Sequence, residues 1–466
     1  MLFVPPLALA LVNLLLLSWV LFRRRKARSS QPIILSSPHA IRQLLKPSNL
    51  NEGEKLQSRA YPNKRLVQAF GIRNTFVSPS TDVHTAFRSK AQDLIKPFSS
   101  SSSGESWEAF YQLTTRIMHA YLDAHSPRKD IGSNQVVTVP FDPFIRCITF
   151  TCILLGLLQI SQLHPSSVDF AEIDHITSCI NEMWTLSKTP AGVPEEMRKD
   201  VNRRLIVLFR DDERFPNPLD FVIPTWETLW RTVAHTLVLS LTHPVFDGLK
   251  PAGNGLHPDT LREGRNLLAS FADLHRDTST LFGTPRPEEG PPSPESIVLE
   301  TMRLHPPSRR IARARIPRSP STDAHSYISL PSMFNARVFR RLRAIAAPTP
   351  DVIIEKADIY TAQRSPSIWG PTAAQFDPFR LNPASVTQEQ KEALLMFGYG
   401  SHMCVARKWA PVAVGVIMEA LAAAGVMWVR APGEGGRQEE WEVDEGRRGW
   451  VGWEVGFDRS RCGGDV

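Results

Sequence analysis

The hydrophobic pattern opens with an uninterrupted apolar run at the N-terminus. Residues 2–22 carry no charge, and a run of this length crosses a bilayer as a helix. A cluster of Arg and Lys residues at 23–28 follows directly. Because positive residues stay on the cytosolic side, the run predicts a single-pass signal-anchor with the main body facing the cytosol. The alternative is a cleaved signal peptide, whose charges would precede the apolar run.

Helical spacing of apolar positions recurs through most of the remaining chain. A Ser/Thr/Asp cluster predicts that one helix begins near Ser80. Alternating apolar and polar residues around Gly-rich turns predict hairpins over 426–458. The pattern therefore indicates a mainly α fold with small β-sheets. Further helices are predicted over 107–122, 145–163, 174–188, 194–210, 224–241, 257–281, 293–305 and 409–421.

Two segments lack such a pattern. Prolines interrupt the polar, basic stretch that ends near residue 64, which indicates a linker and the start of the main body. Residues 317–350 are basic and match no regular element, so we expect a solvated insertion. The predicted organisation is an anchor (1–22), a basic linker (23–64) and one large domain (65–466).

Composition narrows the classes of function. The chain has 466 residues, 42% of them hydrophobic, which is enough for a large core. Its five cysteines are odd in number and show no Cys-x-x-Cys pair, so we expect reduced thiols. No P-loop, dinucleotide fingerprint or internal repeat appears, and we expect no nucleic-acid partner. A net charge of +7 suits docking to an acidic protein.

One loop carries candidate chemistry at residues 397–410. Its glycines allow a tight turn, and Cys404 precedes the predicted helix 409–421. A thiolate at this place gains from the positive helix end and from backbone N–H groups, as an iron ligand requires. The alternative is an ordinary buried cysteine, a common fate of a free thiol.

The loop resembles the haem-binding loop of the cytochrome P450 family. Phe397, Gly400, His402 and Cys404 match the family pattern, whereas Ala406 stands where the family usually has Gly. The resemblance implies that these residues bind haem b and that Cys404 is the axial ligand of its iron.

The helix near Ser80 carries a second matching motif. His84 and Arg88 lie four residues apart and share a helix face. In the family a Trp or His followed by such an Arg binds a haem propionate, so both residues are candidates for cofactor binding. A solvated Arg on an amphipathic helix is the alternative. One of Arg309, Arg310 and Arg313 is a further candidate for a propionate.

A third motif lies about a hundred residues before the Cys loop. Glu300 and Arg303 share a helix face ahead of a Leu-His-Pro-Pro sequence. The family pairs this Glu-x-x-Arg motif with the Arg of a Phe-x-Pro-x-Arg sequence, here Arg380. The resemblance therefore predicts a structural triad of Glu300, Arg303 and Arg380.

The central helix of the family matches least well. Glu227 and Thr228 stand where the family has an acid and a Thr above the haem, and they are the predicted catalytic residues. Pro224 replaces the usual glycine-based distortion and would free a carbonyl to hold a water. The alternative is that Pro224 begins the helix and Glu227 is a first-turn acid.

The resemblance covers about 74–421 and implies the P450 fold behind a transmembrane helix. The implied activity is monooxygenation of a small lipophilic substrate, a secondary metabolite, with O2. Electrons would come from an NADPH-cytochrome P450 reductase, with cytochrome b5 as a further donor, at the endoplasmic reticulum membrane. Two alternatives stay open: a redox-neutral haem-thiolate isomerase or dehydratase, and a non-catalytic haem-binding protein.

Overall fold

The computed structural model describes most of the main body. The predicted anchor, Cys462 and the predicted insertion at 317–350 lie outside the described residues. Among the residues that are described, no helix is both long and apolar enough to cross a membrane. The described ranges are 31–99, 103–125, 136–160, 164–210, 212–242, 267–278, 282, 292–315, 352–382, 385–432 and 449–461.

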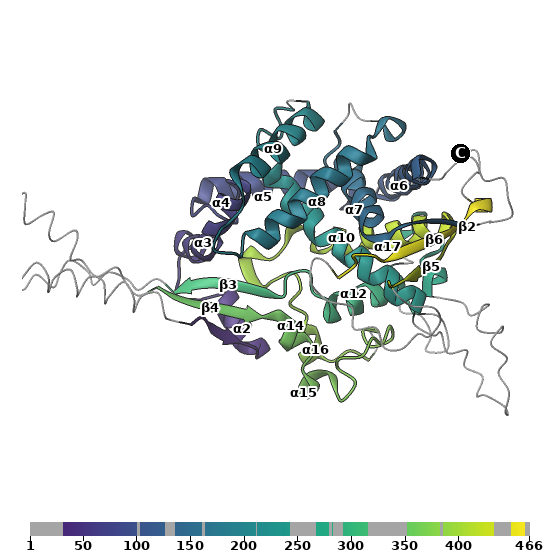
Figure 1. Ribbon diagram of the computed structural model, residues 1–466. Helices are drawn as coiled ribbons and strands as arrows, with labels where there is room; N and C mark the ends of the chain where they lie inside the picture. The colour runs from purple at the N-terminus through teal and green to yellow at the C-terminus, as the bar shows by residue number, and fades with distance from the viewer. Residues whose placement is uncertain are drawn as a thin grey trace, which may run out of the picture.

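Helices make up most of the described body, and two small sheets lie at its edges (Figure 1), which confirms the predicted mainly α class. The longer helices are α5 (Thr81–Ile95), α6 (Ser103–His125), α7 (Phe141–Cys152), α8 (Phe170–Leu186), α9 (Glu195–Phe209), α10 (Leu219–Thr242), α12 (Pro294–Leu304) and α17 (Trp409–Ala423). The shorter ones are α2 (Pro38–Leu45), α3 (Glu52–Ala60), α4 (Lys64–Phe70), α14 (Ile359–Gln363), α15 (Pro366–Trp369) and α16 (Gln388–Ala393).

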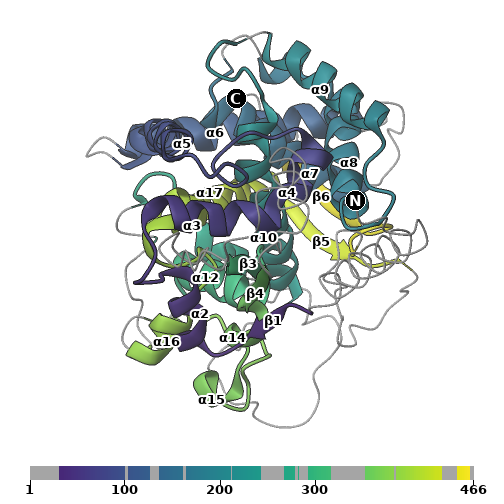
Figure 2. The same ribbon diagram turned by 90° about the vertical axis from the view of Figure 1, so that its left-hand side faces the viewer.

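The first sheet combines distant parts of the sequence (Figure 2). Strand β4 (Ile353–Asp358) pairs parallel with β1 (Ile33–Leu35) and antiparallel with β3 (Arg310–Arg315). The second sheet is antiparallel, in the order β2 (Val136–Pro140), β6 (Glu454–Asp458) and β5 (Val426–Arg430). The pairing of β5 with β6 agrees with the hairpin predicted at the C-terminal end.

Helix α17 lies at the centre of the core, directly after the Cys loop. Its residues Ala413, Val416, Ile417 and Leu421 are fully buried, and the helix packs against α6, α10 and α12. Such all-round burial explains why its sequence is apolar on every face. The Cys loop is therefore attached to a rigid element.

The segment predicted as a linker is folded. Residues 33–60 form β1, α2 and α3, each short because of the intervening turns. Helix α3 begins with a capping box, in which the Asn51 side chain accepts from the Glu54 N–H and Glu54 accepts from the Asn51 N–H. Its far end buries Leu56 and Ala60. This local capping, rather than a long apolar repeat, makes the helix stable.

The helix predicted over 257–281 is not continuous. Of this stretch the structure describes 267–278, where a single 3₁₀ turn, Leu267–Phe271, is followed by irregular turns. Asp273 adopts a left-handed backbone with φ of 58°, which no α-helix accommodates. The next turn presents His275 to Glu419 of α17, and the Glu419 carboxylate accepts from the His275 backbone N–H at 2.9 Å.

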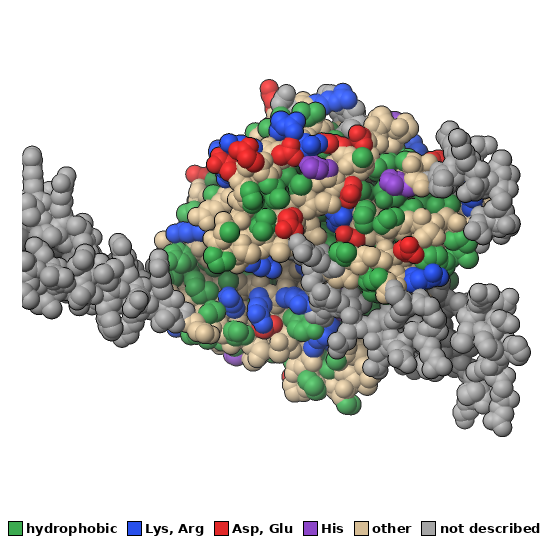
Figure 3. Space-filling model, viewed as in Figure 1, with side chains coloured by type: hydrophobic (Ala, Val, Ile, Leu, Met, Phe, Trp, Pro, Cys, Tyr) green, Lys and Arg blue, Asp and Glu red, His purple; other side chains and the backbone are tan. Residues whose placement is uncertain are grey.

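Charged side chains are unevenly placed on the face shown in Figure 3. Lys and Arg side chains gather over β3 and β4, whereas acidic and basic side chains alternate over α9. In β3 the side chains of Arg310 and Arg315 are 56% and 66% exposed and pair with Asp358 and Glu355 of β4. Arg313 of the same strand, by contrast, points inward and is buried.

Candidate functional site

The Cys loop connects the end of α16 with α17 and depends on two glycines. Gly398 and Gly400 have φ of 75° and 80°, a region that side-chain-bearing residues rarely adopt. A Cβ on Gly400 would also lie 2.9 Å from Lys46 Cβ. The Cys404 backbone N–H donates to the Phe397 carbonyl at 2.9 Å and closes the loop. Phe397 and Gly400 therefore shape the turn that presents Cys404.

Cys404 is an exposed free cysteine. The protein packed around the sulfur nevertheless raises the pKa of the thiol by desolvation, although the Ala406 N–H and the charge of Arg407 act to lower it. Helix α17 begins at Trp409, as the sequence predicted, and a 3₁₀ turn, Val405–Arg407, separates its end from Cys404. Ionisation of this thiol would thus depend on a bound cation, because a metal ion deprotonates the thiol that it binds.

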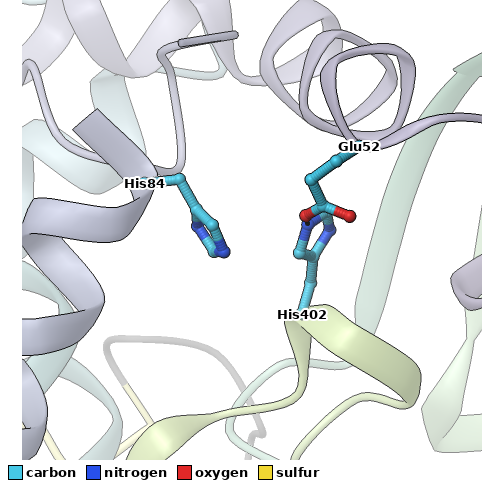
Figure 4. Close-up of side chains that lie close together, drawn as sticks. All are labelled: Glu52, His84 and His402. Carbon is cyan, nitrogen blue, oxygen red and sulfur yellow. Dashed lines mark hydrogen bonds and ion pairs between the residues drawn. The ribbon is translucent and has the colours of Figure 1, made fainter. Parts of the chain in front are cut away.

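Three side chains converge beside the loop (Figure 4). Glu52 comes from the first turn of α3, His84 from the first turn of α5, and His402 from the Cys loop. Glu52 Oε1 lies 2.5 Å from His402 Nε2, and the centroids of the two imidazole rings are 5.0 Å apart. The loop thereby joins elements that lie far away in sequence.

The protonation states of this group follow from burial and from a neighbouring cation. Burial lowers the pKa of His402 to about 4, which the bond to Glu52 opposes and Arg59 reinforces. Burial and Arg59 also lower the pKa of His84. Partial burial acts to raise the pKa of Glu52, but His402, Lys55 and His84 outweigh it and the net shift is downward. At neutral pH an ionised Glu52 therefore accepts a hydrogen bond from a neutral His402.

Arg59 anchors His84 from the other side. Its guanidinium donates to the Thr75 carbonyl at 2.6 Å, and Thr75 Oγ1 lies 2.7 Å from His84 Nδ1. Burial lowers the pKa of Arg59 to about 10, with a small opposing effect of Glu52. Arg59 stays charged although its burial is unfavourable, and it therefore makes its surroundings strongly positive.

Arg313 and Arg88 add to this positive charge. Arg313 is 9% exposed, and within the described part of the chain its guanidinium donates only to the neighbouring Ala312 carbonyl, at 2.9 Å. Burial and Arg59 lower the pKa of Arg313 to about 9. Arg88 donates to the Ser401 carbonyl of the Cys loop at 3.1 Å. Among the three arginines around β3 proposed from sequence, Arg313 is the buried one, and in the described part of the chain its charge faces no carboxylate.

We refer to Arg59, His84, Arg88, Arg313 and His402 as the cationic cluster. The side chains of Glu52, His84 and His402 place ligand atoms within 4.8 Å of one another, as a metal site would. A divalent cation there would face the guanidinium of Arg59, whose Nη2 is 3.5 Å from His84 Nδ1. Three arginines against one glutamate favour an anion. The cluster therefore fits an anionic ligand.

The predicted triad is brought together in the interior. Glu300 accepts from Arg303 through Nε at 2.7 Å and Nη2 at 2.8 Å, and from Arg380 Nε at 3.1 Å. The side chains of Glu300 and Arg303 are fully buried and that of Arg380 is 9% exposed. Arg303 also donates to the carbonyls of Gln363 and Ala373. The triad thus connects α12 to the loops that precede the Cys loop.

Pro224 lies inside α10, because the helix begins at Leu219. The alternative in which Pro224 begins the helix is therefore wrong. The missing N–H frees the Asp220 carbonyl, but the water expected there is replaced by a side chain: Asn74 Nδ2 donates to that carbonyl at 2.8 Å. The Asp220 carboxylate in turn accepts from the Arg73 N–H at 2.7 Å. Residues 73–74 thereby fix the segment leading to α5 against α10.

Glu227 and Thr228 lie in the middle of α10. Glu227 is 4% exposed and Thr228 is half-buried. The adjacent Trp226 is fully buried, and its Nε1 donates to Thr149 Oγ1 of α7 at 3.1 Å. The neighbouring packing fixes the rotation of the helix, so the acid and the alcohol are held in one orientation. Their catalytic role stays a prediction.

A buried histidine pair connects α10 with the end of α12. The rings of His235 and His305 stack with centroids 4.2 Å apart. Burial, with Arg364 as the largest charge effect, lowers the pKa of His305 to about 3, and burial also lowers the pKa of His235. Both rings are therefore neutral, and the histidine of the Leu-His-Pro-Pro sequence acts in packing.

Sequence reasoning missed Glu52 and Arg59. Both lie in the segment predicted as a linker, and neither belongs to a motif. The only available signal was the Asn51 to Glu54 capping pattern, which marks a helix but not its partners. The structure shows that α3 contributes the carboxylate of Glu52 and the guanidinium of Arg59 to the site.

Comparison with known proteins gives a partial match in sequence. Two curated proteins from Aspergillus niger, both named benzoate 4-monooxygenase bphA, are each 30% identical to this chain over 168 residues. The match covers 36% of this chain, and the chain spans only 28% of the length of those relatives. No protein-family model matches the chain.

Solved structures similar to this chain are cytochrome P450s. The six-coordinated enzyme from Thermus thermophilus has 12% identity, 83% coverage of both chains and a TM-score of 0.48. CYP154A1 from Streptomyces coelicolor has 17% identity, 86% coverage of both chains and a TM-score of 0.45. Retinoic acid-bound cyanobacterial CYP120A1 has 14% identity, 86% and 83% coverage and a TM-score of 0.49.

Proposed function

We propose that this chain is a haem-thiolate monooxygenase that oxidises a small lipophilic substrate. The observation that carries the proposal is the placement of the exposed Cys404 thiol on a glycine-shaped loop that also contributes His402 to the cationic cluster. A soft ligand on a loop that also reaches a cluster with two buried arginines suits a flat metal complex that carries carboxylates.

The residues present fit haem b by the chemistry of their donor atoms. Cys404 would be the axial ligand of the iron, and the cationic cluster would hold the propionates, with Arg59 and Arg313 as its buried guanidiniums. When bound, the haem supplies the oxidation chemistry with O2. The chain contributes binding and orientation: the Ala406 N–H and Arg407 favour the thiolate, and the triad of Glu300, Arg303 and Arg380 braces the loops that precede Cys404.

Proton delivery is the proposed role of Glu227 and Thr228. A hydroxyl both donates and accepts a hydrogen bond, so Thr228 can hold a proton and pass it on. Glu227 is the adjacent acid in the same helix turn, and it would exchange protons with Thr228 or with water. Thr228 is half-buried, so part of its surface is accessible to a ligand or a water, which supports this role.

The partners and the location are part of the same proposal. The chain shows no nucleotide-binding motif, so electrons would come from an NADPH-cytochrome P450 reductase, with cytochrome b5 as a further donor. Residues 2–22 would anchor the protein in the endoplasmic reticulum membrane, where the reductase would share the cytosolic face. We propose a secondary metabolite as the substrate, and benzoate is a test compound because the partial relatives are named for it.

A reconstituted turnover assay tests the proposed function. The full chain in membranes is mixed with reductase, NADPH and O2, and benzoate and a panel of lipophilic polyketides and terpenoids are analysed for products that contain one added oxygen atom from O2. Labelled oxygen in a product supports the monooxygenase. Product formation without NADPH indicates a redox-neutral isomerase or dehydratase, and the lack of haem in the purified protein contradicts both enzymatic roles.

A further inference from the structure

Glu52 is an acidic residue whose carboxylate lies at the cationic cluster, where an anionic ligand would bind. It comes from the first turn of α3, and its side chain is 41% exposed, whereas the His402 side chain that it contacts is 4% exposed. The contact between Glu52 Oε1 and His402 Nε2 is 2.5 Å. Its carboxylate therefore extends from a partly exposed position into the cationic cluster.

Helix capping does not account for this contact. The capping box of α3 uses Asn51 and Glu54, which satisfy each other's backbone N–H groups. Within its own helix, Glu52 has a single ion-pair neighbour, Lys55, at 3.8 Å, a distance at which an exposed pair contributes little. The strongest interaction of Glu52 is thus the one with the Cys loop, 350 positions away in sequence.

The hydrogen-bonding capacity of His402 makes this contact exclusive. The Nε2 atom of an imidazole carries at most one hydrogen, and here Nε2 faces the Glu52 carboxylate. A ligand carboxylate that binds His402 at the same atom must therefore displace Glu52. Arg59 interacts electrostatically with Glu52 and would attract a ligand carboxylate at the same place.

We propose that Glu52 is an internal occupant of the anion site, which holds His402 in the haem-free protein and leaves it when a haem propionate binds. This inference rests on the proposed function, since it names the ligand as haem. Glu52 is then a positioning residue: it keeps the Cys loop and α3 together before the cofactor is loaded, and it lowers the affinity for the cofactor by competing with it.

Haem titration of the haem-free full chain tests the competition. Removing the competing charge-assisted hydrogen bond is expected to tighten haem binding on the order of 10-fold in Glu52→Gln. Because Glu52 is partly exposed, the variant is expected to fold normally, which circular dichroism checks. Glu195→Gln on α9 removes an exposed carboxylate that pairs with residues of its own helix and is the matched control.

A second ligand and a second variant isolate the contact. Haem dimethyl ester has no free carboxylates, so its affinity is expected to be equal in wild type and Glu52→Gln. Glu52→Asp keeps the charge but shortens the side chain by one methylene, and it is expected to tighten haem binding as Glu52→Gln does. If Glu52→Asp instead binds haem as wild type does, the negative charge at residue 52 lowers haem affinity without the contact to His402, and the inference is wrong.

The remaining outcomes separate the inference from the proposed function. Equal or weaker haem binding by Glu52→Gln, in a wild type that binds haem, overturns the inference and leaves the proposed function intact. A wild type that binds neither haem nor its ester overturns the proposed function and the inference with it. Tighter binding of both haem and the ester by Glu52→Gln shows improved access and not competition, which also contradicts the inference.

Discussion

Replacing Glu300 with Gln tests whether the buried triad stabilises the packing of α12 against the loops that precede the Cys loop. The Glu300 carboxylate accepts three hydrogen bonds from Arg303 and Arg380 and one from the Asp377 N–H, at 2.7–3.2 Å. An amide keeps the shape but removes the charge and presents an NH2 group to at least one guanidinium. The fully buried Arg303 guanidinium then lacks its anion, and Arg380 keeps only the Asp377 carboxylate, at 3.8 Å.

The expected loss follows from this burial. Removing one partner of a buried ion pair costs about 3–5 kcal/mol, because the remaining charge stays desolvated. A typical domain has about 5–15 kcal/mol of stability, so the change is a large fraction of the total. We expect the free energy of unfolding to fall by about 3–5 kcal/mol and the protein to retain little haem.

Equilibrium unfolding in urea, followed by circular dichroism, measures this loss. Arg203→Gln is the matched control: it breaks an ion pair with Asp200 in which the Arg203 side chain is 66% exposed, and its expected cost is below about 1 kcal/mol. If Glu300→Gln costs no more than this control, the triad does not brace the fold and the argument from burial fails.

Three further predictions concern the helix, the packing and the membrane. Thr228→Val is expected to keep haem content and substrate binding but to shift NADPH and O2 consumption from product to peroxide; unchanged coupling removes Thr228 from proton delivery. Asn74→Ala leaves the half-buried Asp220 carbonyl without its donor, and thermal unfolding is expected to show a loss of about 1–3 kcal/mol; a loss within error means that water replaces the amide. Deleting residues 2–22 is expected to move much of the protein from the membrane to the soluble fraction in sedimentation, whereas a secreted full-length product with a new N-terminus near residue 25 contradicts the anchor.

Local motifs made much of the fold and part of the site predictable. Ser80 predicted the beginning of α5 because its hydroxyl caps the Val83 N–H, an interaction within one helical turn. Glu300 and Arg303 are three residues apart, so helical geometry alone places both on one face. The apolar run at 409–421 likewise predicted the helix that α17 forms.

Long-range partners were not predictable in the same way. Nothing near Glu52 indicates that its carboxylate reaches His402, and nothing near Asn74 indicates that it caps a carbonyl freed by Pro224. A freed carbonyl accepts equally from water or from an amide, and only the fold decides between them. The break near Asp273 has the same origin, because His275 bonds to Glu419 of a distant helix.

The central claim is that the Cys404 thiolate binds haem iron. The most direct measurement is the carbon monoxide difference spectrum of the reduced full chain, recorded for wild type and for Cys404→Ser. We expect a thiolate-type spectrum in wild type and its loss in the variant, because a serine hydroxyl stays protonated and donates far less charge to iron. An unchanged spectrum in Cys404→Ser, or a wild type without a thiolate-type spectrum, contradicts the claim.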